Sequence, residues 1–347
     1  MRAFITGSTG LLGNNLVRAL VAGGHTVRAL ARSSAKAEAQ LEGLRGVEVV
    51  TGDLDDVGAF APALDGVDVV FHTAAYFREY FGRGEHEARL QALNVDATVA
   101  LARAAHARGV GRFVHTSSSG TIRDRDDGGL ATEADAHPTD ALPNRYFASK
   151  VRADLALTLV AEEIGIDVVT ILPGWMFGPG DAAPTSAGKL VQDALAGRLP
   201  PVALPGGTSI VDARDVAVVM ARAAEAASPH DRFIVAGRHA SLAEVIGRLA
   251  ELTGRAPPRA TLPYAAAWGF AAAQEAFAWL TSREPLVTRM ALATLNTGHH
   301  LSSAHAENTL GATFRPLGET LEDTVAWYRA RAEAPLAAPG ARGYSGA

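Results

Sequence analysis

The chain has 347 residues, of which 48% are hydrophobic and 20% are charged, the composition of a globular protein with a substantial core. The net charge of −5 argues against a nucleic-acid partner, and the lack of cysteine excludes disulfides, thiolate metal sites and cysteine nucleophiles. No apolar run reaches the roughly 18 residues of a membrane span, and the first motif starts at residue 6, so we expect a cytoplasmic protein. We also expect no metal site.

Short apolar strands and helical patterns alternate through the first half of the chain. We expect strands at Arg2–Ile5, Thr26–Ala31, Val47–Val50, Val67–His72, Arg112–Thr116 and Val168–Leu172, and helices at Leu11–Ala22, Ala88–Arg108 and Tyr146–Ile164. Near-continuous Val/Ile/Leu runs separated by helices indicate a parallel sheet covered on both faces. The pattern therefore predicts a doubly wound α/β domain.

The rhythm changes after Pro173, where proline and glycine become frequent. We expect a helix at Asp212–Ala227, a strand at Arg232–Ala236 that returns to the main sheet, and mostly helical structure from Ser241 onward. The helix expected at Tyr264–Leu280 is interpreted as a buried packing helix. These segments predict a main domain at 1–174 plus about 210–237, a smaller lobe at about 175–209 and 238–332, and a flexible tail at 333–347.

A glycine-rich segment connects the first strand to the first helix, with the spacing Gly7-x-x-Gly10-x-x-Gly13. The first glycine permits a tight turn, the second lets the backbone approach a pyrophosphate, and the third allows close helix–strand packing. The helix start adds free N–H groups for the phosphates. We expect contacts to a dinucleotide cofactor from Thr6, Gly7, Thr9, Gly10, Leu11, Leu12 and Gly13.

With this spacing, residues 1 to about 330 resemble the extended short-chain dehydrogenase/reductase family. The resemblance implies a Rossmann domain followed by a C-terminal substrate lobe. It also places Asp53 and Leu54 near the adenine, and Thr73, Ala74 and Ala75 along the cofactor. Further cofactor contacts are implied for Thr116, Pro173, Gly174 and Met176.

The end of the second strand predicts the choice of nicotinamide cofactor. An acidic residue there selects NAD, whereas an arginine can accept the 2′-phosphate of NADP. Here Arg32 follows the strand, with Ser33 and Lys36 within reach and no acid present. We therefore expect NADP(H), with NAD(H) as the alternative if Arg32 is only a solvated surface residue.

Tyr146 and Lys150 are spaced i, i+4, which puts both side chains on one helix face. A tyrosine with a pKa of about 10 is a poor acid–base group at neutral pH, and a nearby ammonium is expected to lower that pKa. The pair can then exchange a proton with a carbonyl or alcohol oxygen. The resemblance places a third catalytic group on Ser118, and Ser117 and Ser119 remain alternatives.

Two segments, Thr116–Ile122 and Tyr146–Lys150, resemble the dihydroflavonol 4-reductase-like branch of the family. This branch implies a reductase of ketones or aldehydes, or the reverse alcohol oxidation. The alternatives are a nucleotide-sugar epimerase with bound NAD and, less favoured, a non-catalytic NADP-sensing regulator. Asn94 matches a family position near the site and is equally interpretable as a helix N-cap.

Aromatic side chains follow the strands on the side where ligands bind in such sheets. Tyr76, Phe77, Phe81, Trp175 and Phe177, together with Ser118, predict an apolar pocket for a small carbonyl or alcohol substrate. The alternative is that these aromatic residues pack between the lobes. The family also implies a homodimer formed through the helices at Ala88–Arg108 and Tyr146–Ile164.

Overall fold

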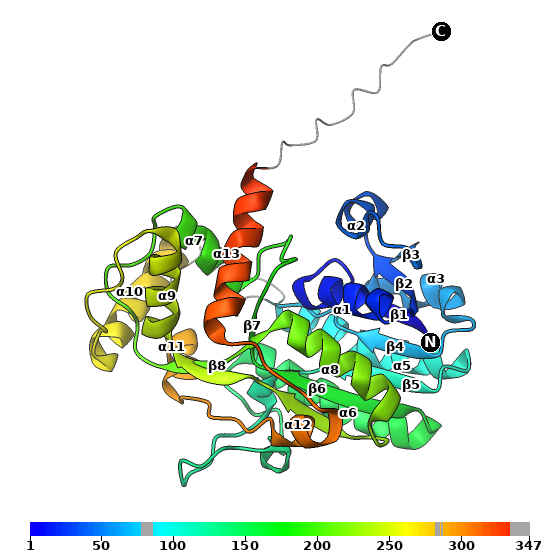
Figure 1. Cartoon of the computed structure of the whole chain (residues 1–347). Coiled ribbons are helices and arrows are strands. Elements are labelled where there is room, and N and C mark those ends of the chain that lie inside the picture. Colours follow the sequence, from blue (N-terminus) through cyan, green and yellow to red (C-terminus); the bar gives the residue numbers. More distant parts are fainter. Residues whose placement is uncertain (78–85, 282–284, 286, 334–347) are drawn as a thin grey trace.

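The computed structural model describes residues 1–77, 86–281, 285 and 287–333 (Figure 1). Phe81 and residues 334–347 of the expected tail lie outside the described residues. The elements are labelled in chain order as in Figure 1.

Seven parallel strands form the main sheet in the order β3-β2-β1-β4-β5-β6-β9. Their bounds are β1 Arg2–Thr6, β2 Thr26–Ala31, β3 Val47–Thr51, β4 Val69–His72, β5 Arg112–Thr116, β6 Asp167–Pro173 and β9 Arg232–Val235. The order reverses direction between β1 and β4, which is the point where open α/β sheets bind ligands. The predicted doubly wound fold is confirmed, and β9 returns to the sheet beside β6 as expected.

Helices cover both faces of this sheet because successive strand residues point to opposite sides. Ile5 faces a core formed with α1 (Leu11–Ala22), α8 (Ala213–Ala226) and α12 (Ala304–Leu310). Phe4 faces the opposite core, formed with α3 (Val57–Phe60), α5 (Ala97–Ala107) and α6 (Arg145–Ile164). The main domain also contains α2 (Ser34–Leu41) and short 3₁₀ turns at Leu54–Asp56, Ala61–Leu64, Ser119–Thr121 and Glu133–Asp135.

The helix expected at Ala88–Arg108 is continuous but not uniform. It comprises α4 (His86–Leu90), a π-helical segment at Gln91–Asp96 and α5. Asn94 lies inside the π-helical segment, so the interpretation of Asn94 as a helix N-cap is wrong. Such segments are rare and frequently lie at functional sites.

The second lobe packs α7 (Ser186–Leu195), α9 (Leu242–Thr253) and α13 (Leu317–Glu333) around a separate apolar core. It also contains a three-stranded sheet in the order β10-β8-β7, which the sequence analysis did not identify. Its strands are short: β7 Trp175–Phe177, β8 Gly207–Asp212 and β10 Arg238–Ser241.

The expectation of a buried helix at Tyr264–Leu280 is wrong. In α10 (Tyr264–Thr281) only three small residues are buried, namely Ala267, Ala271 and Ala278, and they face α11 (Arg289–Asn296) and the rest of the lobe. The large side chains of Trp268 and Leu280 are exposed. Alanines at helical spacing permit close helix packing, and this turns the bulky residues outward.

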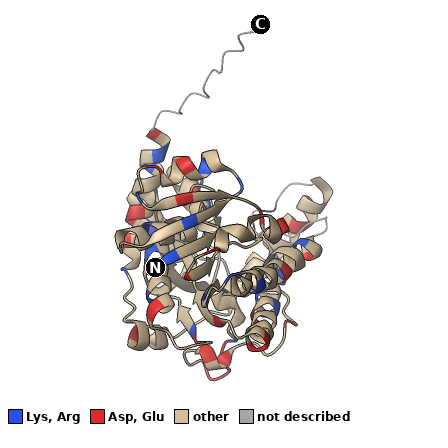
Figure 2. Ribbon diagram, turned by 90° about the vertical axis from the view of Figure 1, so that its right-hand side faces the viewer, with Lys and Arg blue, Asp and Glu red and all other residues tan. Residues whose placement is uncertain are grey.

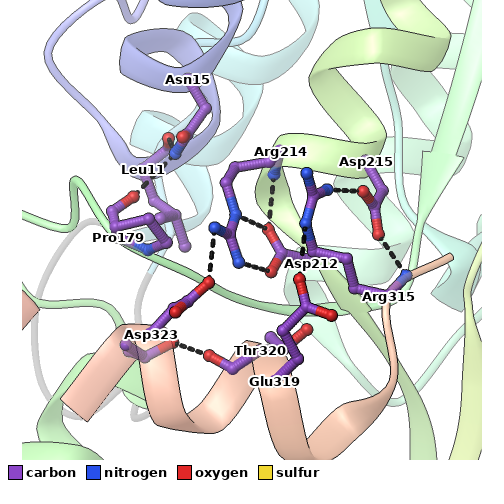
Figure 3. A network of polar contacts seen from close by, with 11 residues as sticks. Leu11, Asn15, Pro179, Asp212, Arg214, Asp215, Arg315, Glu319, Thr320 and Asp323 are labelled. Atoms are coloured by element: carbon purple, nitrogen blue, oxygen red, sulfur yellow. Dashed lines mark hydrogen bonds and ion pairs between the residues drawn. The ribbon is translucent and has the colours of Figure 1, made fainter. Parts of the chain in front are cut away.

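Polar contacts join the second lobe to the main domain close to the start of α1 (Figure 3). The Asn15 side-chain amide donates to the carbonyl of Pro179 at 2.8 Å. Arg214, in the first turn of α8, makes a bidentate contact with Asp212 and also reaches Asp323 of α13 at 2.7 Å. The loop after β7 is thereby held against the glycine-rich turn.

Basic and acidic side chains are interspersed over the face of the molecule that Figure 2 presents. Among the described residues, none of the helices is both long and apolar enough to cross a membrane.

Two helical glycines provide a matched test of how closely α1 packs against the glycine-rich turn. A Cβ on Gly13 would collide with the Gly7 carbonyl, whereas a Cβ on Gly247 in α9 would meet open space. We expect Gly13→Ala to lower the free energy of unfolding by about 1–3 kcal/mol through overpacking. We expect Gly247→Ala to raise it by about 0.5–1 kcal/mol because alanine favours the helix. Urea unfolding measures both, and equal effects would contradict the packing.

Candidate active site

The glycine-rich turn has the backbone geometry that a dinucleotide phosphate requires. Gly7 has a φ of +70°, and a Cβ there would lie 2.8 Å from the backbone nitrogen of Ala74. Helix α1 starts after Gly10 without a side-chain cap, which leaves its first N–H groups for an anionic group. The turn is thus a cradle that side chains would fill, and it fits the phosphates of a nicotinamide dinucleotide.

Hydrogen bonds hold the ends of β1 and β4 beside this turn. Thr6 and His72 share a hydrogen bond of 2.7 Å, and the Thr73 hydroxyl donates to the Thr6 carbonyl at 2.7 Å. The second nitrogen of His72 is 2.9 Å from the Thr98 hydroxyl. Burial, followed by the positive charges of His115 and Lys150, holds the pKa of His72 well below its usual range, so its ring is neutral. The structure brings Thr6, Thr73 and Ala74 together as the sequence predicts.

Arg32 and Lys36 lie exposed beyond the carboxyl end of β2. Ser33, between them, caps α2: its side chain accepts a hydrogen bond from the Lys36 backbone N–H. Within the described residues, neither cationic side chain has a hydrogen-bond or ion-pair partner. Asp53 begins the adjacent 3₁₀ turn by accepting from the Asp55 N–H at 3.2 Å, so part of its carboxylate serves as a cap.

Tyr146 and Lys150 lie on one face of α6, near its start. Asn144 caps this helix through its side-chain oxygen, which fixes where the helix begins. The Lys150 Nζ lies 5.9 Å from the centre of the Tyr146 ring and donates to the Thr116 carbonyl at 2.8 Å. Lys150 is buried, and Tyr146 is half-buried. The i, i+4 spacing therefore brings the two groups together at the end of β5.

The expectation that Lys150 lowers the pKa of Tyr146 is not met. Burial, reinforced by the negative charge of Asp154, raises the pKa of Tyr146. Burial also lowers the pKa of Lys150 to about 8, although Asp154 opposes that change. The physical reason is that loss of water disfavours both charged forms. Tyr146 is consequently a protonated phenol that can donate a proton.

The three serines after β5 have different surroundings. The Ser117 hydroxyl is buried and donates to Asp154 at 2.8 Å. Ser119 is buried as well, whereas Ser118 is half-buried. The Ser118 oxygen accepts from the Gly120 N–H at 3.2 Å, which leaves its own proton available to a ligand. These contacts favour Ser118 over its neighbours.

A buried polar network behind Lys150 was missed by the sequence analysis. Asp154 accepts from Ser117, lies 3.4 Å from His115 and 3.2 Å from Arg232. Burial works to raise the pKa of Asp154, but the contacts with His115, Arg232 and Ser117 lower it overall, so the carboxylate is ionised. Asp154 follows Lys150 at i+4, and this spacing is a signal that the sequence does contain.

The predicted substrate residues divide into two groups. Tyr76 is held by Asn94, which accepts from its N–H at 2.7 Å and donates to its carbonyl at 3.0 Å. Phe77 is 49% exposed and meets the Tyr146 ring edge-on, with 4.9 Å between ring centres. Phe77 therefore lies beside Tyr146, and Asn94 holds the preceding residue, Tyr76.

On the second lobe, Trp175 is half-buried and donates to the Ser186 hydroxyl at 3.1 Å. Phe177 is fully buried in the lobe core, where its ring contacts Trp175. The core position removes Phe177 from any pocket surface in this structure. Gly174 packs against the carbonyl of Ser209, and Met176 lies partly buried against the main core.

Comparison with known proteins agrees with this geometry. Residues 3–237 match the model of the NAD dependent epimerase/dehydratase family. The chain is 32% identical over 333 residues to the sterol demethylase protein B of Methylococcus capsulatus, covering 95% of this chain and 99% of that one. It is 31% identical to a putative dihydroflavonol 4-reductase of Synechocystis sp., covering 94% of each.

Among solved structures, the crystal structure of gox2253 superposes with a TM-score of 0.82 at 30% identity, covering 95% of this chain and 98% of that one. The family model, the two full-length relatives and this structure agree with one another. The chain therefore belongs to the NAD-dependent epimerase/dehydratase family of extended short-chain dehydrogenases/reductases.

Proposed function

We propose that this protein is an NADPH-dependent reductase of a ketone or aldehyde, or catalyses the reverse alcohol oxidation. The observation that carries the proposal is the grouping of three residues at the carboxyl end of β5. Tyr146 and Lys150 come from the first turns of α6, and the half-buried Ser118 follows the strand. A similarity to a protein named as a reductase over nearly the whole chain supports the same reaction class.

The residues that would hold the cofactor follow from the turn and the strand ends. The backbone at Gly7, Gly10 and the start of α1 would bind the pyrophosphate, with N–H groups as the donors. Arg32 and Lys36 would contact a 2′-phosphate. A bound nicotinamide supplies or accepts the hydride. The free cationic groups of Arg32 and Lys36 favour NADP(H) over NAD(H).

The protein's own residues manage the proton. Ser118 donates a hydrogen bond to the substrate carbonyl oxygen and orients it. The protonated Tyr146 phenol then transfers its proton to that oxygen as the carbonyl carbon is reduced. The positive charge of Lys150 stabilises the phenolate that remains, until solvent returns a proton.

The surroundings of Tyr146 favour an apolar substrate. The Phe77 ring borders it, Tyr76 precedes Phe77 in the chain, and Trp175 lies half-buried on β7 of the second lobe. The two full-length relatives are named for a sterol and for a dihydroflavonol, which are largely apolar ring compounds.

For the proposed homodimer, the exposed Leu155 and Leu159 of α6 provide an apolar contact surface.

Replacing the tyrosine tests the proposed reaction. We expect Tyr146→Phe to lower kcat about 10²–10⁴-fold, because the proton donor is removed. The measurement is NADPH and NADH consumption with a panel of aryl ketones, aldehydes and sterol ketones. Tyr264→Phe, which alters an exposed tyrosine on α10, is the matched control and should retain full activity. Consumption of neither cofactor, with NAD tightly bound to the purified protein, would establish an epimerase instead.

Arg32 provides a separate test of cofactor choice. We expect Arg32→Ala to raise KM for NADPH about 10- to 100-fold and to leave KM for NADH nearly unchanged, since a charge-assisted hydrogen bond to phosphate is lost. Arg45→Ala is the control, because Arg45 is also exposed but precedes β3, at the amino ends of the parallel strands, whereas Arg32 follows the carboxyl end of β2. An equal effect on both cofactors would exclude 2′-phosphate recognition by Arg32.

The pKa of Lys150 predicts the pH dependence of the free enzyme. Burial lowers this pKa to about 8, so the ammonium form decreases above that pH. We expect kcat/KM for NADPH in carbonyl reduction to be level below this value and to fall about tenfold per pH unit above it. In Lys150→Arg the falling limb should move to higher pH, because arginine keeps its charge. A level profile up to pH 10 in the unmodified protein would refute this role.

A further inference from the structure

His299 adopts an unusual backbone conformation at the junction of the two lobes. It follows α11 and has a φ of +37°, in the left-handed region that non-glycine residues rarely occupy. The Ser209 hydroxyl of β8 donates to its carbonyl at 3.0 Å. Backbone strain of this kind persists where the surroundings enforce it, and it gathers at functional sites.

The imidazole of His299 has an acceptor at each nitrogen. Nε2 lies 2.9 Å from the carbonyl oxygen of Ser119, and Nδ1 lies 3.0 Å from the carboxylate of Asp124. Burial works to raise the pKa of Asp124, but hydrogen bonds from His299 and Thr297 lower it overall, so this carboxylate is ionised. A carbonyl oxygen can only accept, so Nε2 of His299 donates to Ser119, and the Asp124 carboxylate lies against the other ring nitrogen.

We infer that His299 is a positioning residue, which fixes the loop of the catalytic Ser118 (residues 117–122) by donating a hydrogen bond to the Ser119 carbonyl. The inference rests on the proposed function for its catalytic meaning. Ser119 is the next residue after Ser118, and its carbonyl also accepts from the Ile122 N–H at 3.0 Å. Loss of the His299 bond would free this loop to shift the Ser118 hydroxyl away from the substrate oxygen.

Further contacts brace the segment that carries His299. The His300 carbonyl accepts from the Ala131 N–H at 2.9 Å, and the Ser302 N–H donates to the Ala131 carbonyl at 2.9 Å. Leu301 joins an apolar cluster with Ile122 of the serine loop and Leu172 of β6. These contacts hold the segment that carries His299 against the chain on either side of Asp124, at Ile122 and at Ala131.

The charged groups around His299 come from several elements. Asp124 and Arg123 follow the serine loop, His137 follows the 3₁₀ turn at Glu133–Asp135, and His300 is the next residue. The His300 ring lies against that of His239 of β10, tilted by 35° and with 4.2 Å between ring centres. Burial, followed by the positive charges of Arg123 and His299, lowers the pKa of His137.

Hydrogen exchange and kinetics then separate positioning from general stability. In His299→Ala we expect faster exchange of the amides in residues 117–122 and a kcat lowered about 10- to 100-fold, with an unchanged Kd for NADPH. Asp124→Asn should retain the slow exchange. His300→Ala, at the adjacent residue, is the matched control and should behave as the unmodified protein.

The two hypotheses fail in different ways. If the unmodified protein reduces no carbonyl compound, the proposed function is wrong, although the exchange rates in His299→Ala still report whether His299 holds the serine loop. If Tyr146→Phe abolishes turnover but His299→Ala changes neither kcat nor the exchange of residues 117–122, the positioning role is wrong.

Discussion

The close approach of α1 to the end of β1 is the constraint on which the rest of the site depends. Gly13 packs its backbone on the carbonyl of Gly7, and Gly7 in turn packs on Ala74 after β4. No side chain fits at either contact. The helix start, with its free N–H groups, consequently faces the crevice where the strand order reverses. The bond between Thr6 and His72 keeps the two strand ends in this arrangement.

Burial of charge determines the chemistry available at this crevice. Lys150 is almost fully removed from water and retains the carbonyl of Thr116 as its hydrogen-bond acceptor. Asp154 lies on the same helix face and is held ionised by His115, Arg232 and Ser117. An ionised group in the interior is costly unless it is paired. Here the arrangement keeps a negative charge behind the catalytic pair, which favours the protonated phenol of Tyr146.

The site is shared between the two lobes. The main domain contributes the glycine-rich turn, the serine loop and α6, whereas the second lobe contributes Trp175 and His299. Asn15 and Arg214 also connect the lobes, through their contacts with Pro179 and Asp323 (Figure 3). A substrate that enters between the lobes would therefore contact groups whose positions depend on both of them.

Local patterns in the sequence were sufficient for much of this protein. The alternation of apolar strands and helices predicted the doubly wound sheet, including the return of β9, because strand and helix periodicities are local properties. The i, i+4 spacing of Tyr146 and Lys150 likewise predicted their proximity. The three short strands of the second lobe were missed, since they lie in segments where glycine and proline interrupt the apolar pattern.

Only the tertiary structure decided the features that depend on distant contacts and on burial. It distinguished Ser118 from Ser117, because the Ser117 hydroxyl is taken by Asp154, 37 residues away. It placed Phe177 in a core and turned the aromatic residues of α10 outward. It also set the direction of the Tyr146 pKa, since desolvation is a property of the surrounding protein and not of the spacing to Lys150. His299 and Ser119 are 180 residues apart, and no local pattern records a contact that only the packing of the two lobes creates.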